Sequence, residues 1–126
     1  MILQESGEMY LETLYILSRS SENVRSLDIA GYRGFSKPSV SRAVGLLQSG
    51  GFITVDAKGY LHLTSYGEEI AKKIFERHTL LTESLVSIGV PREVAEDDAC
   101  KMEHDISDVS FEALRRHYEE NGKGRN

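Results

Sequence analysis

Three side chains with metal-binding chemistry stand close together near residue 100. Cys100, Glu103 and His104 occupy positions i, i+3 and i+4, so on a helix they leave the same face. A thiolate, a carboxylate and an imidazole would then converge, and a divalent transition metal such as Fe²⁺ uses these donors. The alternative is a small buried cysteine flanked by surface polar groups, because free cysteine is commonly a core residue. The triplet alone leaves both interpretations open.

The composition predicts a soluble globular protein of one domain or two small units. The 126 residues are 40% hydrophobic and 28% charged, as in ordinary globular proteins. The single cysteine excludes an intrachain disulfide. No apolar run approaches the roughly 20 residues of a membrane span, and the N-terminus lacks the basic and apolar regions of a leader peptide. We therefore expect a cytoplasmic protein.

Charges are distributed unevenly along the chain. The net charge of −5 argues against a protein that coats nucleic acid nonspecifically. Residues 24–60 nevertheless carry five basic and two acidic side chains, whereas residues 76–126 carry 12 acidic and seven basic ones. A basic segment beside an acidic half is typical of a small DNA reader with a cation-binding half, although a solvated surface can show the same imbalance.

The first half of the chain has the element order of a winged helix-turn-helix. Apolar periodicity predicts helices over residues 5–19 and 27–32, the second of them capped by Ser26. A third helix is expected after Ser36, which can act as its N-cap, and it should end at the following glycine pair. Two strand-like runs with a turn between them then form the wing.

The second half of the chain is expected to contain helices only. A long helix should begin at Thr64 or Ser65 and end at Gly89. A fifth helix, starting at Pro91, carries the Cys-Glu-His triplet, and a last helix follows the capping residue Ser107.

The outward face of the third helix could read DNA. It presents short donors and two cations without a carboxylate, which phosphates would repel. Arg42 can make a bidentate contact with guanine, while Arg33 and Lys58 are expected at backbone phosphates. The alternative is a solvated polar surface. The residues predicted to bind DNA are Arg33, Ser36, Lys37, Pro38, Ser39, Ser41, Arg42 and Lys58.

Five stretches carry a likeness that covers nearly the whole chain: residues 8–15 (EMYLETLY), 37–41 (KPSVS), 63–67 (LTSYG), 77–78 (RH) and 98–104 (DACKMEH). Together they closely resemble the diphtheria toxin repressor and manganese transport regulator family. The resemblance implies a metal-dependent repressor, not an enzyme, that binds a palindromic double-stranded operator as a homodimer. It implies a mainly α fold with a winged helix-turn-helix DNA-binding domain over residues 1–70. An all-helical metal-binding and dimerisation domain is expected over residues 71–126, with no SH3-like third domain.

The resemblance also assigns metal ligands. One set matches the iron-responsive members, and another matches the manganese-responsive members, which place two ions close together. Two positions depart from the ancillary site of the iron branch: Thr82 replaces an acidic residue, and Glu96 replaces a histidine. The iron-branch set is Met9, Cys100, Glu103 and His104, the manganese-branch set includes Glu12 and His78, and Glu96 is a weaker candidate.

Donor softness then indicates the cation. A thiolate at Cys100 and a thioether at Met9 favour Fe²⁺, and Mn²⁺, which prefers oxygen donors, is the second choice. Because Met9 and Glu12 precede the reading helices, a shared cation would tie the reading half to the half that should dimerise. The recognition helices of a dimer must fit major grooves about 34 Å apart, or a multiple of that. The expected dimer surface comprises Ile106, Val109, Phe111 and Leu114.

Other functions stay open from the residues alone. A thiol-redox or ligand-responsive winged-helix regulator would use Cys100 as its sensor, which needs an exposed reactive thiol. A metalloenzyme would need an open coordination position and a general base. The chain shows no zincin pattern and no phosphate-cradling loop, so we expect no enzyme. The chain could also be a structural module that binds a protein partner, and such a module would not bind DNA in a mobility-shift assay.

Overall fold

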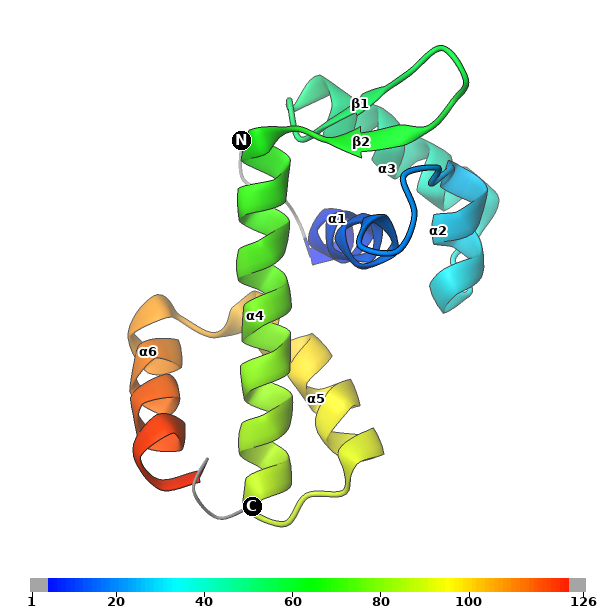
Figure 1. Cartoon of the computed structure of the whole chain (residues 1–126). Coiled ribbons are helices and arrows are strands. Elements are labelled where there is room, and N and C mark those ends of the chain that lie inside the picture. Colours follow the sequence, from blue (N-terminus) through cyan, green and yellow to red (C-terminus); the bar gives the residue numbers. More distant parts are fainter. Residues whose placement is uncertain (1–4, 123–126) are drawn as a thin grey trace. The chain divides into compact units, whose positions relative to one another are not determined.

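The computed structural model describes residues 5–122 and is mostly helical (Figure 1). It confirms the predicted fold class, a mainly α protein with a winged helix-turn-helix followed by a helical region. The elements are α1 (Glu5–Ser18), α2 (Ser26–Arg33), α3 (Lys37–Ser49), β1 (Ile53–Val55), β2 (Leu61–Leu63), α4 (Ser65–Ser87), α5 (Arg92–Asp105), α6 (Asp108–His117) and the π-helical turn η1 (Tyr118–Gly122).

Contacts between Cα atoms divide the chain into two compact units. The first unit ends at Lys73 and the second begins at Ile74, both within α4. Among the described residues, no helix combines the length and apolar character needed to cross a lipid bilayer.

The first unit has one continuous apolar core. Helices α1, α2 and α3 contribute their apolar faces, and the hairpin and the start of α4 complete the cluster. Burial of this apolar area is the main force that holds the three helices and the wing together. The buried members are Tyr10, Leu11, Leu14, Val24, Ile29, Ala30, Val40, Ala43, Leu47, Phe52, Ile53, Leu61 and Ala71.

The caps of α2 and α3 fix how these helices begin. The Ser36 hydroxyl accepts a hydrogen bond from the Ser39 amide at 3.2 Å, which confirms the predicted cap of α3. The predicted cap of α2 is wrong, because Ser26 is already the first helical residue and Arg25 is the N-cap. The Asp28 carboxylate accepts from the Arg25 amide at 2.8 Å and satisfies that donor instead.

The wing is a two-stranded antiparallel hairpin whose base is tied to α4. Ile53 pairs with Leu63 and Val55 with Leu61. The Thr64 hydroxyl donates to the Gly51 carbonyl at 2.7 Å and accepts from the amide of Gly67 at 3.0 Å. Thr64 is therefore the cap of α4, one of the two residues predicted for that position.

The second unit packs α5 and α6 against the C-terminal half of α4. Its smaller apolar core contains Leu81, Ala99 and Phe111, one residue from each helix. Phe111 was expected on a dimer surface, but its side chain is 8% exposed and belongs to this core. The prediction failed because helical periodicity shows that a face is apolar without showing what covers it.

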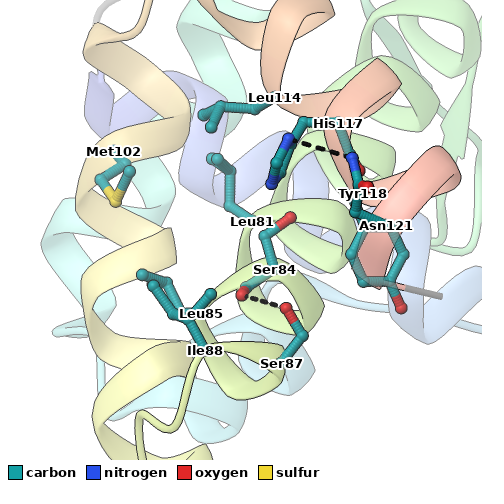
Figure 2. Close-up of a pocket in the computed structure, with 10 residues that line it drawn as sticks. All are labelled: Leu81, Ser84, Leu85, Ser87, Ile88, Met102, Leu114, His117, Tyr118 and Asn121. Atoms are coloured by element: carbon teal, nitrogen blue, oxygen red, sulfur yellow. Dashed lines mark hydrogen bonds between the residues drawn. The ribbon is translucent and has the colours of Figure 1, made fainter. Parts of the chain in front are cut away.

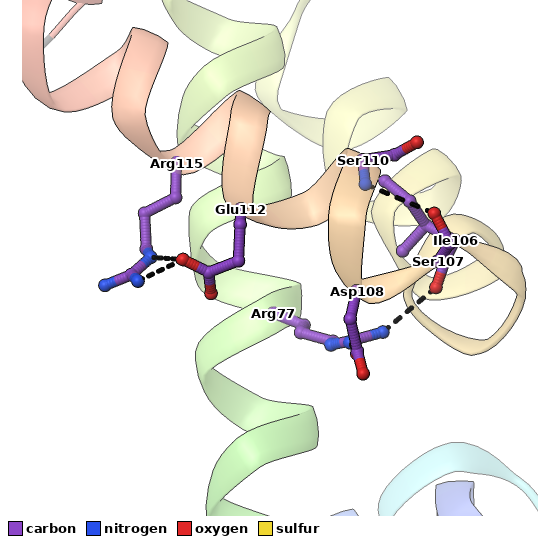
Figure 3. A network of polar contacts seen from close by, with 7 residues as sticks. All are labelled: Arg77, Ile106, Ser107, Asp108, Ser110, Glu112 and Arg115. Atoms are coloured by element: carbon purple, nitrogen blue, oxygen red, sulfur yellow. Dashed lines mark hydrogen bonds and ion pairs between the residues drawn. The ribbon is translucent and has the colours of Figure 1, made fainter.

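Arg77 holds the start of α6 in place (Figure 3). Its guanidinium lies 5.0 Å from the centre of the Phe111 ring and donates to the Ile106 carbonyl at 3.1 Å. It also pairs with the carboxylate of Asp108, the first residue of α6. The Ser107 hydroxyl accepts from the Ser110 amide at 3.2 Å, which confirms the predicted cap.

Candidate metal centre and DNA-reading face

The Cys-Glu-His triplet does converge on one face of α5. Cys100, Glu103 and His104 each offer a ligand atom, and these atoms lie within 4.8 Å of one another. The Glu103 and His104 side chains are buried, with 0% and 2% exposed, whereas Cys100 is partly exposed. One helical turn therefore presents sulfur, oxygen and nitrogen donors together.

His78 reaches the same carboxylate from α4. Its Nδ1 lies 2.9 Å from Glu103 Oε2, while Glu103 Oε1 lies 3.4 Å from Nε2 of His104. Glu103 thus sits between two imidazoles inside the second unit. Burial of a carboxylate is costly unless hydrogen bonds or opposite charges compensate it. The geometry supplies one such hydrogen bond and leaves a positive charge as the natural further partner.

The chemistry of this donor set fits a divalent transition metal. A single thiol, a carboxylate and two imidazoles combine soft, hard and borderline ligands, which suits Fe²⁺, Mn²⁺ or Zn²⁺ better than Ca²⁺ or Mg²⁺. A structural zinc site would instead use four cysteine and histidine ligands, and the chain has only one cysteine.

The other predicted ligands differ in their burial. Met9 is partly buried and Glu12 is buried, and both are on α1 in the first unit. Thr82 is buried one turn after His78, where a hydroxyl replaces the expected carboxylate. Glu96 is exposed one turn before Cys100. These assignments remain predictions.

Glu96 belongs to a surface charge cluster. Arg92 donates to Glu83 at 2.8 Å, and this hydrogen bond with the charge of Glu83 raises the pKa of Arg92; Glu96 adds a smaller contribution. An exposed acid of this kind contributes little to stability by itself.

The outward face of α3 is exposed and free of acids in its first turn. The apolar face of α3 packs inward, which leaves the polar residues between those positions outside. Arg42 lies among them and is the residue suited to bidentate guanine contact. Lys58 is exposed in the wing turn. The exposed residues of the predicted face on α3 and at its cap are Ser36, Lys37, Pro38, Ser41 and Arg42.

Two residues of the predicted DNA-binding set, Ser39 and Arg33, are not among the exposed side chains described for this face. The Ser39 hydroxyl is hydrogen-bonded to the hydroxyl of Tyr10, a buried residue of α1 whose ring packs edge-on against Phe35. Ser39 therefore points toward α1 and helps to fix the start of α3. Arg33 ends α2, but its side chain lies outside the part that the structure describes.

The sequence predicts the wing turn over residues 56–59, but it does not predict the hydrogen bonds that the Asp56 carboxylate makes there. Asp56 Oδ2 lies 2.9 Å from His62 Nε2, and Asp56 Oδ1 accepts from the amides of Lys58 and Tyr60 at 2.9 and 3.0 Å. The hydrogen bonds from His62, Tyr60 and Lys58 lower the pKa of Asp56. An aspartate three residues before Gly59, whose φ is +85°, is the local signal for such a turn.

The chain matches two domain families over almost its full length. Residues 2–66 match the iron dependent repressor N-terminal DNA binding domain, and residues 64–121 match the iron dependent repressor metal binding and dimerisation domain. These matches confirm the resemblance noted in the sequence.

Curated proteins and solved structures agree with the domain matches. Transcriptional regulator MntR of Escherichia coli O6:H1 is 32% identical over 113 residues, covering 90% of this chain and 73% of its own length. Iron-dependent repressor IdeR of Mycobacterium tuberculosis H37Rv is 33% identical over 107 residues, 84% of this chain and 46% of its own length.

Among solved structures, that of the manganese regulator SloR is similar, with a TM-score of 0.82 and 27% identity. The match covers 94% of this chain and 55% of SloR. ScaR with bound Zn²⁺ is similar with a TM-score of 0.75 and 26% identity, over 90% of this chain and 53% of that one. The chain therefore belongs to the iron dependent repressor family of metal-responsive, DNA-binding transcriptional regulators.

Proposed function

We propose that this protein is a repressor of metal-homeostasis genes whose operator binding is activated by Fe²⁺ or, as second choice, Mn²⁺. The observation that carries the proposal is the convergence of Cys100, Glu103 and His104, with His78 on the same carboxylate. Such a cluster is costly to bury unless it binds something positive. A repressor acting on chromosomal operators works in the cytoplasm.

The ligand set that we propose starts from side chains of the second unit. Glu103 and His104 are already buried in place, Cys100 supplies the soft donor, and His78 orients Glu103 through its hydrogen bond. When bound, the ion supplies positive charge and coordination bonds to these donors. The family resemblance predicts Met9, Glu12 and, more weakly, Glu96 as further ligands. Because Thr82 lacks a carboxylate, we expect a second ion to be held less tightly than the first.

The preference for Fe²⁺ over Mn²⁺ rests on Cys100 and Met9. Thiolate and thioether sulfur bind Fe²⁺ better than Mn²⁺, which favours oxygen. The relatives include both a protein named as a manganese regulator and one named as an iron-dependent repressor, so our proposal of Fe²⁺ rests on the sulfur donors.

The DNA partner that we propose is a palindromic duplex read by two copies of α3. Ser36, Lys37 and Ser41 would meet phosphates or mixed base contacts, and Arg42 would read guanine. A homodimer places two recognition helices at half-sites one helical turn, about 34 Å, or a multiple of that apart.

The homodimer would form through the second unit, which matches a dimerisation domain. Its surface has an apolar cavity of about 390 Å³ with Ile88, 77% exposed, at its edge (Figure 2). Exposed apolar patches of this kind mark protein contacts, and a second copy of this chain is the occupant that we propose. The cavity is lined by Leu81, Ser84, Leu85, Ser87, Ile88, Met102, Leu114, His117, Tyr118 and Asn121.

Anaerobic calorimetry with Fe²⁺ and Mn²⁺ tests the metal centre. The wild-type protein should bind Fe²⁺ more tightly, and Cys100→Ala should reduce that preference because Met9 would be the one sulfur donor left in the proposed ligand set. Lys101→Ala is the matched control, since Lys101 is the exposed neighbour. Unchanged Fe²⁺ binding by Cys100→Ala would exclude Cys100 from the ligand set.

Selection from a random duplex library, with metal or with a chelator, tests DNA reading. Metal should be required to enrich a palindrome. Arg42→Ala should then weaken binding to the selected duplex by about 1–3 kcal/mol, more than it weakens binding to random DNA. Gln48→Ala, exposed at the other end of α3, should have no effect. An equal loss on both duplexes would make Arg42 a phosphate contact.

A further inference from the structure

We propose that Arg25 is a phosphate-binding residue of the DNA interface, held in position by the wing. This inference rests on the proposed function and extends it to a residue outside the predicted DNA-binding set. It assigns to the segment before α2 a role that is independent of base sequence, because phosphate contacts position a protein on the duplex without reading it.

The Arg25 side chain lies against the wing. Its guanidinium carbon is 4.5 Å from the centre of the Tyr60 ring, and one guanidinium nitrogen is 3.4 Å from the place where a Cβ would stand on Gly59. A guanidinium stacked on an aromatic ring keeps its N–H groups free for other acceptors while its position is restricted. The absence of a side chain at Gly59 leaves room for this packing.

The backbone on both sides of Arg25 is also fixed. The carbonyl of Val24 accepts from the amide of Leu61 in β2 at 2.8 Å. The amide of Arg25 donates to the Asp28 carboxylate at 2.8 Å. Arg25 is therefore anchored through its main chain to the wing and to α2, and only its exposed side chain has freedom to meet a ligand.

Arg25 and Lys58 place two cations at the same end of the wing. Lys58 directly precedes Gly59, the residue under the Arg25 guanidinium. The nearby carboxylates are used otherwise: Asp28 accepts the Arg25 amide, and Asp56 accepts two wing amides and contacts His62. Among the side chains that the structure describes, no ion pair involves Arg25 or Lys58.

Two neighbouring cations that form no direct ion pair can each accept an external anion as a partner. The anion that a winged helix-turn-helix meets beside its wing is the DNA backbone. Each phosphate neutralised by a basic side chain releases bound counterions, so the contact appears as a steeper dependence of affinity on salt. That dependence separates a phosphate contact from a purely structural packing role.

The experiment measures the affinity for a random-sequence duplex over a range of salt concentrations, with the full chain and saturating Mn²⁺. Arg25→Ala should lower the slope of log K against log [salt] by about one for each protomer, equally on random and selected duplexes. Arg25→Lys should keep the slope, because the charge remains. Arg19→Ala is the matched control, since Arg19 is exposed and lies over a tyrosine ring, 5.8 Å from the centre of Tyr15, elsewhere in the unit.

An unchanged slope for Arg25→Ala overturns the inference and leaves Arg25 a packing residue that joins α2 to the wing. An equal fall for Arg19→Ala also overturns it, because net charge alone would then explain the result. If Arg42→Ala still weakens binding to the selected duplex, the proposed function survives either outcome. If Arg25→Ala and Arg42→Ala both bind DNA like the wild type, the inference on Arg25 and the proposed function both fail. Circular dichroism of each variant verifies that it is folded.

Discussion

The two units of the chain are built around different interiors. In the first unit, an apolar core extends through α1, α2, α3, the hairpin and the start of α4. In the second unit, the apolar core is smaller, and beside it a buried carboxylate, Glu103, contacts two imidazoles. Apolar burial stabilises a fold without a bound ion, whereas a buried ionisable cluster stabilises it only when its charges are compensated. We infer that the reading unit is rigid by itself and that the second unit tightens on binding metal.

The largest expected effect tests the apolar side of this comparison. Phe52 is 1% exposed, and Phe52→Ala should lower the free energy of unfolding by about 3–5 kcal/mol through lost burial and a cavity. Urea unfolding measures the change. Leu46→Ala is the control, because Leu46 is 62% exposed and should change stability by less than about 0.5 kcal/mol. A loss below about 1 kcal/mol for Phe52 would mean that this core does not hold the unit.

The next effect tests the polar side. With Mn²⁺ at 100 times its Kd, the wild-type protein should gain about 2.7 kcal/mol, seen as slower hydrogen exchange of the α5 amides. Glu103→Gln keeps the side-chain size but removes the charge, and it should abolish the gain. Glu112→Gln, in an exposed pair with Arg115, should retain it. Full metal protection in Glu103→Gln would contradict the role of this carboxylate.

A smaller effect concerns the joint between the wing and α4. A Cβ on Gly67 would stand 1.9 Å from the carbonyl oxygen of Phe52. Gly67→Ala should therefore destabilise the first unit by about 1–3 kcal/mol, although alanine is normally the better helix former. Gly31→Ala, with nothing within 4 Å, should stabilise by about 0.5–1 kcal/mol in the same thermal melts. An equal increase in stability for Gly67→Ala and Gly31→Ala would show that the backbone at the joint shifts without cost.

The smallest expected effect concerns the wing turn in acid. The pKa of Asp56 is lowered from its ordinary value of 3.8, chiefly by the hydrogen bond from His62, so ionised Asp56 stabilises the turn above that value. The stabilisation is lost as the pH falls through the lowered pKa. NMR shifts of the Lys58 and Tyr60 amides should therefore move below pH 4 in the wild type and stay constant in Asp56→Asn. Amide shifts that titrate in Asp56→Asn as well would assign the change to another group.

Local signals predicted most of the fold. The caps Ser36 and Ser107 were predictable because a hydroxyl satisfies an amide only three residues away. Arg25 displaced Ser26 as the cap of α2 because the acceptor for its amide comes from Asp28, inside the helix. The position of this N-cap therefore depends on backbone geometry and not on the residue type at the cap.

Long-range contacts account for the features that the sequence did not predict. The Tyr10–Ser39 hydrogen bond joins residues that are 29 positions apart in the sequence. It directs the Ser39 side chain, which was predicted to contact DNA, toward α1. Phe111 was predicted to lie on the dimer surface, but its side chain packs against Arg77 and Leu81. Convergence of the triplet was predictable from helical spacing, and the resemblance named His78, but the Glu103 carboxylate shared by His78 and His104 required the packing of α4 on α5.

The hydrogen bond between Leu61 and Val24 has a consequence beyond the position of Arg25. A two-stranded hairpin normally leaves both outer edges able to add a strand from another molecule. Here the amide of Leu61, at the outer edge of β2, is occupied by the chain segment before α2. Crowding many copies on neighbouring operators should therefore not lead to wing-to-wing aggregation along that edge.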